Sequence, residues 1–124
     1  MYTLIFYRDR RGKEAFLDYL RSLDKRSDKD SRVKLVKIYD CLEILRQLGT
    51  MAGVPYVKHI EGEIWELRPL YDRILFATWD GQRVLILHHF AKKSRITPRR
   101  EIDQAKRNLS DYRKRSDSSD SKNN

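Results

Sequence analysis

The chain has 124 residues, enough for one domain with a modest core and too few for a second independent core. It carries 27 Lys and Arg against 18 Asp and Glu, a net charge of +9, which favours a polyanionic partner: nucleic acid, an acidic protein or an anionic membrane surface. One cysteine excludes an internal disulfide framework, and with three histidines lacking paired spacing it argues against a structural zinc site. No signal peptide and no apolar run of roughly 20 residues is evident, so we expect a cytoplasmic protein.

The first third of the chain predicts one strand and two helices. Residues 2–8 are rich in β-branched and aromatic residues, which indicates a strand. Residues 13–23 and 31–48 repeat apolar residues at helical spacing, and Gly49 marks the end of the second helix. Cys41 lies within this second pattern, so we expect a buried and inert thiol.

Four closely spaced strands follow, at residues 56–60, 63–68, 73–80 and 83–90. The second alternates cleanly: Trp65 and Leu67 point one way, and Ile64, Glu66 and Arg68 point the other way. The last contains the apolar run 84–87, as expected of a central strand covered on both faces.

The chain closes with a predicted helix that Thr97 caps and Pro98 opens. Residues 116–124 are of low complexity, so we expect one domain at 1–115 and a disordered polar tail at 116–124. The order β-α-α-β-β-β-β-α predicts an α+β fold with a mainly antiparallel sheet. We expect the two-helix hairpin to cover one face and the other face to be free to carry chemistry.

The strand ends concentrate permanent cations. Arg68 ends one predicted strand, Arg73 opens the next, and Lys92 and Lys93 end the last. If these strands are neighbours, the cations share one surface without an obvious acidic cluster to neutralise them. Arginine binds phosphate through two parallel hydrogen bonds, so the sequence predicts a phosphate-binding surface.

Cleavage of RNA without a metal needs cations for the charged phosphorane and groups that move protons. Tyr71 and one of the two histidines are the candidate proton movers. His88 and His89 are adjacent and must face opposite ways; period-two alternation groups His88 with Ile86 and Phe90, and His89 with Leu87. The sequence does not decide which histidine shares the cationic face.

Each of these residues also has a structural interpretation. Arg68 could be an ordinary surface arginine, Arg73 could pair with Asp72, and the two lysines could be a solvated strand end. Glu66 is expected to balance one of the arginines rather than to act as a base. By themselves, these residues favour phosphate binding more than they favour catalysis.

Three runs share a pattern with a known family: Lys58 to Arg68, Asp72 to Phe76, and Leu87 to Pro98. They resemble the phage-derived, HigB-like branch of the RelE/ParE toxin superfamily, in which a Glu-Leu-Arg strand, an Arg-opened strand and a Leu-His-Gly-Phe-x-Lys-Lys segment closed by Thr-Pro recur. The resemblance covers about residues 2–112. His89 stands where the family commonly has glycine, so His88 is the matching histidine.

The resemblance implies a RelE-like fold and a bacterial type II toxin, similar to endoribonucleases that cut mRNA in the ribosomal A site without metal or other cofactor. It also implies a cognate antitoxin with a helix-turn-helix domain, bound in a hetero-oligomer. The residues it implicates fall into two groups. The catalytic candidates are Arg68, Arg73, Lys92, Lys93 and His88. The substrate-binding candidates are Lys58, Tyr71, Arg95 and Arg99.

Two other functions are compatible with the same fold. One is a ParE-like toxin that inhibits DNA gyrase by binding it, which predicts DNA breaks with intact mRNA. The other is a nucleic-acid-binding module without catalysis, which predicts salt-sensitive RNA binding and no toxicity. The cluster of lysine, arginine and histidine favours the nuclease.

Overall fold

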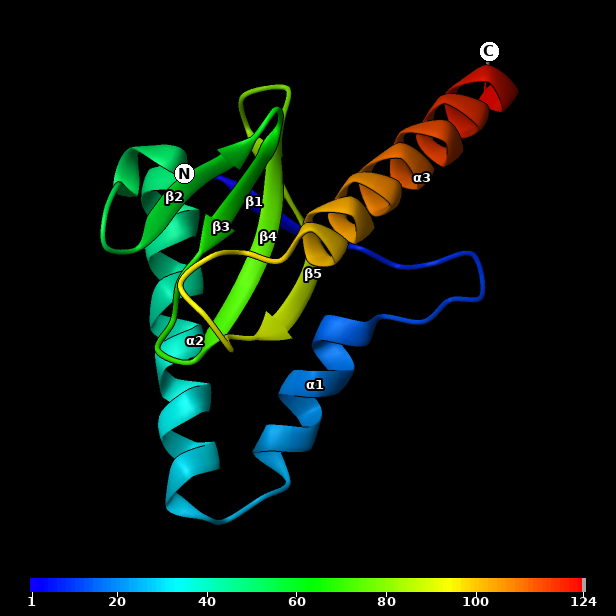
Figure 1. Cartoon of the computed structure of the whole chain (residues 1–124). Helices are drawn as coiled ribbons and strands as arrows, with labels where there is room; N and C mark the ends of the chain where they lie inside the picture. The colour runs from blue at the N-terminus through cyan, green and yellow to red at the C-terminus, as the bar shows by residue number, and fades with distance from the viewer. Residues whose placement is uncertain (124) are drawn as a thin grey trace.

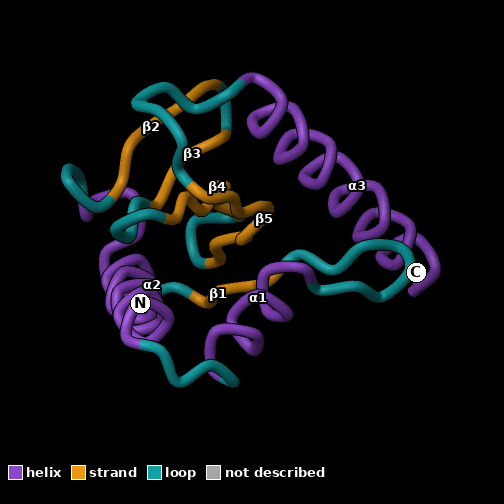
Figure 2. Tube along the Cα trace, turned by 60° about the horizontal axis from the view of Figure 1, so that its bottom comes forward, coloured by secondary structure: helices purple, strands orange, loops and turns teal. Residues whose placement is uncertain are grey.

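The computed structural model describes the backbone of residues 1–123 and the side chains of residues 1–117. A five-stranded sheet lies between two layers of helix, with α1 and α2 on one side and α3 on the other (Figures 1 and 2). In chain order the elements are β1 (Thr3–Phe6), α1 (Ala15–Asp24), α2 (Lys29–Leu48), the 3-10 helix η1 (Gly49–Ala52), β2 (Val57–Glu61), β3 (Ile64–Leu67), β4 (Asp72–Trp79), β5 (Arg83–Ala91) and α3 (Arg99–Asn123).

The strands lie in the order β1-β5-β4-β3-β2. The pairs from β2 to β5 are antiparallel, as successive strands joined by short turns must be, while β1 runs parallel to β5. β1 can run parallel to β5 because the α1–α2 hairpin and the later strands lie between them in the chain and provide a long crossover connection. The predicted α+β fold with a mainly antiparallel sheet is therefore confirmed.

The α1–α2 hairpin covers one face of the sheet, hereafter the hairpin face. Leu20 of α1 and Ile38 of α2 pack on this face against Leu67 and Phe76, all buried. Burial of each such side chain contributes about 1.5–3 kcal/mol. Cys41 of α2 is buried in the same cluster, and burial raises the pKa of its thiol.

The opposite face, hereafter the α3 face, is not free as expected. Ala105 and Leu109 of α3 are buried against Ile64, Leu75 and other apolar residues of this face. The helix has to bury its own apolar stripe, and the apolar half of this face is the surface it meets. Only the end of the sheet near the start of α3 is left to polar residues.

Helix α3 then continues beyond the sheet, as Figure 1 shows. It remains helical to Asn123, past residue 115, where the sequence predicted the end of the ordered domain. Its last residues are all polar, so the low-complexity composition that suggested a disordered tail here accompanies a continued helix. Residue 124 lies outside the described residues, and the division into domain and tail stays a prediction.

A bulge in β5 changes which residues share a face. Leu75 pairs with His88 but Phe76 pairs with Ile86, so Leu87 is one extra residue without a partner on β4. Because one inserted residue reverses the alternation, Leu87 and His88 both lie on the α3 face. The predicted grouping of His88 with Ile86 and of His89 with Leu87 is therefore wrong, and that of His88 with Phe90 is right.

Helix α2 has defined ends. The Asp28 carboxylate accepts a hydrogen bond from the Ser31 backbone N–H at 3.0 Å, which satisfies one N-terminal donor. Gly49 ends the helix with a positive φ of 57°, as the sequence predicted. No helix in the described part of the chain is long and apolar enough to cross a membrane.

Gly49→Ala is expected to destabilise the protein by about 2–5 kcal/mol. The left-handed backbone penalises any Cβ by about 1–2 kcal/mol. The new Cβ would also lie 2.7 Å from two carbons of the Tyr2 ring, and overpacking of this kind costs about 1–3 kcal/mol. Gly62→Ala is the matched control, because Gly62 has a φ of 53° and open space around its Cβ position. Urea unfolding followed by circular dichroism should give the larger loss at Gly49; equal losses would contradict the Tyr2 overlap.

Candidate functional site

Four residues from four neighbouring strands form one row across the α3 face. Lys58 of β2 pairs with Glu66 of β3, Glu66 pairs with Leu75 of β4, and Leu75 pairs with His88 of β5. Directly paired residues point to the same face of a sheet. Neighbouring strands are about 4.8 Å apart, so Glu66 and His88 are roughly 10 Å apart along the row.

Glu66 is the centre of a charge cluster. Its Oε1 lies 3.5 Å from Nε of Arg68 and 3.8 Å from Nε of Arg73, and the Thr97 hydroxyl donates to its Oε2 at 2.6 Å. Glu66 is only 3% exposed. The expected balance between Glu66 and the arginines is therefore present: one carboxylate serves two guanidinium groups, and the neighbouring buried carboxylate of Asp72 also acts on Arg73.

The two arginines are not equivalent. Arg68 is about a quarter exposed, and its Nε is buried without a hydrogen-bond partner. Arg73 is buried, and its Nη1 donates to the backbone carbonyls of Leu70 and Asp72 at 3.2 and 2.8 Å. Burial, and then the neighbouring charge of Arg68, lower the pKa of Arg73. Arg68 is thus the more accessible donor, while Arg73 shapes the turn between β3 and β4 and supplies charge from below the surface.

His88 adds an oriented imidazole to the α3 face. Its Nε2 lies 3.1 Å from Oε1 of Glu101 in the first turn of α3. An ionised carboxylate can only accept a hydrogen bond, so Nε2 carries the proton and, in the neutral ring, Nδ1 keeps a free lone pair. The bulge in β5 is what brings this ring to the same face as the arginines.

His89 lies on the hairpin face. Its ring stacks on Tyr19 at a centroid distance of 4.8 Å and is tilted against Phe16 at 5.4 Å. Burial, and then the charge of His88, lower the pKa of His89. Of the two histidines, His88 is therefore the one on the face with Arg68 and Arg73.

The remaining cations lie around the end of the sheet. Lys92 and Lys93 follow β5 and are exposed, and the Lys92 backbone N–H donates to the Tyr71 carbonyl at 2.8 Å. Tyr71 is 61% exposed. We call Arg68, Arg73, His88, Lys92 and Lys93 the basic site.

The segment that follows β5 crosses back over the sheet toward β3 (Figure 1). The hydrogen bond from Thr97 to Glu66 fixes this path. The sequence predicted Thr97 as the cap of α3; the helix begins at Arg99, and the hydroxyl is used on Glu66 instead. Arg95 of this segment is exposed, whereas Arg99 is engaged by Glu61 and Asp103 at 2.5 and 3.4 Å.

Among the side chains of residues 1–117, no group of three or more His, Cys, Asp and Glu is placed to hold a metal ion. Two acidic residues beside the basic site, Glu66 and Glu101, are each engaged by cationic or imidazole partners.

Residues 18–110 match the family described as Phage derived protein Gp49-like (DUF891), three quarters of the chain. The chain belongs to this family. The Gp49-like family is part of the HigB/RelE-like toxin group of phage-derived proteins, which confirms the resemblance stated from the sequence. No curated protein matches the chain.

The Gp49-like match begins within α1 and ends within α3, so it includes the whole basic site. Membership of a toxin family implies a cognate antitoxin.

The sequence missed two contacts that support the site. Glu101, which orients His88, is 13 positions away along the chain, and Tyr19, which donates to Asp72 at 2.7 Å, is 53 positions away. Neither belongs to a local motif, so no signal in the sequence identifies them. The Tyr19–Asp72 bond links α1 to the first residue of β4, next to Arg73.

Tyr19→Phe is expected to destabilise this Gp49-like protein by about 2 kcal/mol. Asp72 is 4% exposed and its Oδ2 has no hydrogen-bond partner, so loss of the Tyr19 hydroxyl leaves the buried carboxylate unsatisfied. Tyr39→Phe is the matched control, because Tyr39 is 52% exposed. Urea unfolding at pH 7 should show a lower free energy of unfolding for Tyr19→Phe and little change for Tyr39→Phe.

The pH dependence gives a second readout of the same bond. Burial, and then Asp72, raise the pKa of Tyr19 above its ordinary value of 10.0. A raised pKa favours the neutral hydroxyl in the folded state, so this stabilisation is complete below about pH 10 and is lost as the pH rises further. Above pH 10 the free energy of unfolding of the wild type should therefore fall more than that of Tyr19→Phe. If the two free energies fall in parallel with pH, the Tyr19–Asp72 hydrogen bond does not contribute this stability.

Proposed function

We propose that this protein is the toxin of a type II toxin-antitoxin system and acts as a metal-independent endoribonuclease that cuts mRNA and inhibits translation. The observation that carries the proposal is the sharing of one buried carboxylate, Glu66, by Arg68 and Arg73. The two guanidinium groups, next to an oriented histidine and two exposed lysines, suit the phosphorane formed in RNA cleavage.

The reaction begins when a base removes the proton from the 2′-hydroxyl. His88 is the proposed base, because Glu101 fixes the proton on Nε2 and leaves the lone pair on Nδ1. The 2′-oxygen then attacks the adjacent phosphorus, and the bond from phosphorus to the 5′-oxygen breaks. The products are a 2′,3′-cyclic phosphate and a 5′-hydroxyl.

The cations have separate roles in this scheme. Arg68 is the more accessible of the two arginines, and its guanidinium donates to the non-bridging oxygens of the phosphorane. Arg73 adds charge and holds the backbone of the turn through the Leu70 and Asp72 carbonyls. Lys92 and Lys93 bind the flanking phosphates, and an ammonium or the Tyr71 hydroxyl supplies the proton to the leaving 5′-oxygen. Lys58 and Arg95 extend the cationic track.

The partners follow from the family and the charge. A basic protein with a net charge of +9 is attracted to mRNA and to ribosomal RNA, and we propose the ribosomal A site as the place of cleavage. The proposed antitoxin carries a helix-turn-helix domain and binds the toxin in a hetero-oligomer.

Induced expression of the chain, with and without a candidate antitoxin encoded beside it, tests the proposal. Mapping of mRNA 5′ ends should give new ends with 5′-hydroxyl groups, at fixed positions within codons when cleavage depends on the ribosome. Intact mRNA together with DNA breaks would instead indicate gyrase inhibition. Salt-sensitive RNA binding without growth arrest would indicate a module without catalysis.

A further inference from the structure

A polar cavity lies beside the basic site, at the edge of β5. Strand β1 ends at Phe6, paired with Ile86, whereas β5 continues to Ala91, so the last part of β5 has no strand on this side. The last backbone bond of this pair runs from the Tyr7 N–H to the Ile86 carbonyl at 2.8 Å. A cavity of about 480 Å³ occupies the place where β1 would continue, between α1 and α3.

One wall of this edge cavity is aromatic. The rings of Phe16 and His89 line it, and the face of His89 away from it is covered by Tyr19. No described residue hydrogen-bonds the His89 ring, and burial lowers its pKa, so the neutral imidazole offers one donor and one acceptor. Such a wall can stack a flat heteroaromatic ring and also bind its edge.

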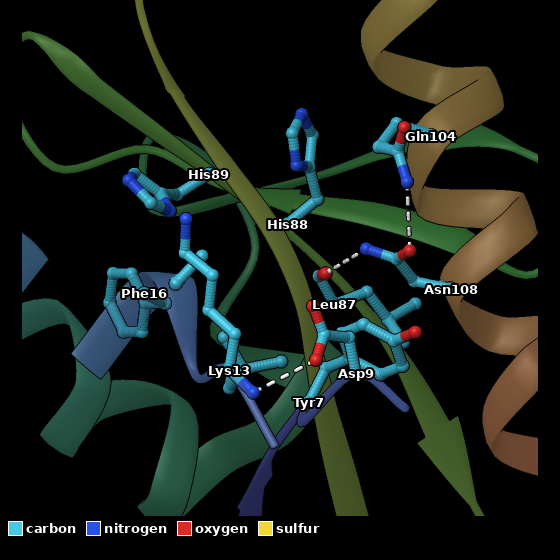
Figure 3. Close-up of a pocket in the computed structure, with 11 residues that line it drawn as sticks. Tyr7, Asp9, Lys13, Phe16, Leu87, His88, His89, Gln104 and Asn108 are labelled. Carbon is cyan, nitrogen blue, oxygen red and sulfur yellow. Dashed lines mark hydrogen bonds between the residues drawn. The ribbon is translucent and has the colours of Figure 1, made fainter. Parts of the chain in front are cut away.

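The opposite wall is made of two side-chain amides on α3. Gln104 Nε2 donates to Asn108 Oδ1 at 2.9 Å, and Asn108 Nδ2 donates to the Leu87 carbonyl at 2.7 Å. Figure 3 shows this chain of bonds on the α3 side of the cavity, with His88 between it and His89. Each amide can donate two hydrogen bonds, so each retains one N–H for a ligand while its orientation is already fixed.

The rim carries both charges. Lys13 and Asp9 line the cavity, and Figure 3 shows the Lys13 side chain extending toward His89. The Asp9 Oδ1 accepts from the backbone N–H groups of Arg11 and Lys13 at 2.9 and 2.8 Å, which holds the loop in place. His88 belongs both to this lining and to the basic site, so the two sites share a wall.

We propose that this edge cavity binds one nucleobase of a single-stranded RNA, next to the phosphate held at the basic site. Stacking rings combined with fixed donors and acceptors are the features by which proteins recognise unpaired bases. The volume falls within the range of small-ligand sites, roughly 300–1,000 Å³. The inference rests on the proposed function for its substrate, and it makes Gln104 and His89 determinants of the preferred base.

Titration of the isotope-labelled protein with nucleosides and with inorganic phosphate tests the cavity without requiring cleavage. Adenosine, guanosine, cytidine and uridine, which carry no phosphate, should shift the NMR signals of Phe16, His89 and Gln104 with dissociation constants of about 1 mM. Inorganic phosphate should shift the Arg68 and Arg73 signals instead. Nucleosides that leave the cavity signals unchanged at 10-fold higher concentration, roughly 10 mM, would overturn the proposal.

Gln104→Leu supplies the matched variant. It should weaken the tightest nucleoside about tenfold, because one fixed hydrogen-bond donor is lost, and it should change the base preferred beside the cut in mapped mRNA ends. Gln47→Leu is the control, since Gln47 lies exposed on α2, away from both sites. Equal nucleoside affinities in the wild type and both variants would overturn the proposal.

The outcomes separate this inference from the proposed function. If the wild type binds nucleosides in the cavity but cuts no mRNA, the base site stands and the nuclease proposal fails. If mRNA is cut with unchanged preference in Gln104→Leu and no nucleoside binds, the nuclease stands and the base site fails.

Discussion

Arg68→Ala is expected to lower mRNA cleavage by about 10²- to 10³-fold, the usual effect of removing one donor that stabilises transition-state charge. The Arg68 side chain is 26% exposed and its ion pair with Glu66 is long, at 3.5 Å, so its loss should leave the fold intact. The rate should be measured from the appearance of cleaved ends in a translating extract, and circular dichroism should confirm folding.

Arg21→Ala is the matched control for this change. Arg21 also pairs with a carboxylate, Asp18, but on the exposed surface of α1 and away from the basic site. Arg68→Lys should retain little activity, because an ammonium cannot reproduce the planar fork of donors. Full activity in Arg68→Ala would remove Arg68 from the proposed mechanism.

Arg73→Ala should also abolish cleavage. A loss of activity in this variant can be assigned to chemistry only when its stability is measured as well. Arg73 is buried and bonds two backbone carbonyls of the turn that carries Leu70 and Asp72. Its removal therefore changes both the charge of the site and the shape of the turn. Arg68 is more accessible than Arg73 and is therefore the cleaner test of chemistry.

The second large effect is on stability. Glu66→Gln is expected to lower the free energy of unfolding by about 3 kcal/mol, because it removes the carboxylate that the buried Arg73 shares with Arg68 and leaves the two like charges side by side. Urea unfolding measures this difference directly.

Glu63→Gln is the matched control for Glu66→Gln. Glu63 pairs with Arg113, but its side chain is 56% exposed, and exposed ion pairs contribute about 0–1 kcal/mol. Equal stabilities of the two variants would mean that Glu66 does not hold the arginine pair together.

The elements of this fold were predictable from local patterns. The alternation in β3 correctly assigned Trp65 and Leu67 to one face and Ile64 and Glu66 to the other. The apolar run in β5 correctly predicted a central strand covered on both faces, and Gly49 correctly marked the end of α2. Such features follow from the period of a strand or helix and from the conformational freedom of glycine, which act over a few residues.

The composition of the basic site was predictable for the same reason. Arg68 and Arg73 flank one turn, and the lysines end a strand, so their positions follow once the strands are assigned. Which histidine joins them was not predictable, since the answer depends on a bulge at Leu87 that only the pairing of β4 with β5 creates. Helix α3 likewise covers the second face because its stripe needs a partner surface, which no local pattern specifies.

The sequence by itself determined the kinds of element, the net positive charge of the chain and the cationic side chains at the strand ends. The tertiary structure alone decided that Glu66 lies between two arginines, that Glu101 orients His88, and that Thr97 serves the carboxylate rather than the helix. These contacts join residues far apart in the chain, and their geometry depends on strand register and on the docking of α3. The local preferences of single residues do not specify strand register or the docking of α3. The charged residues are therefore brought together only when the sheet is assembled.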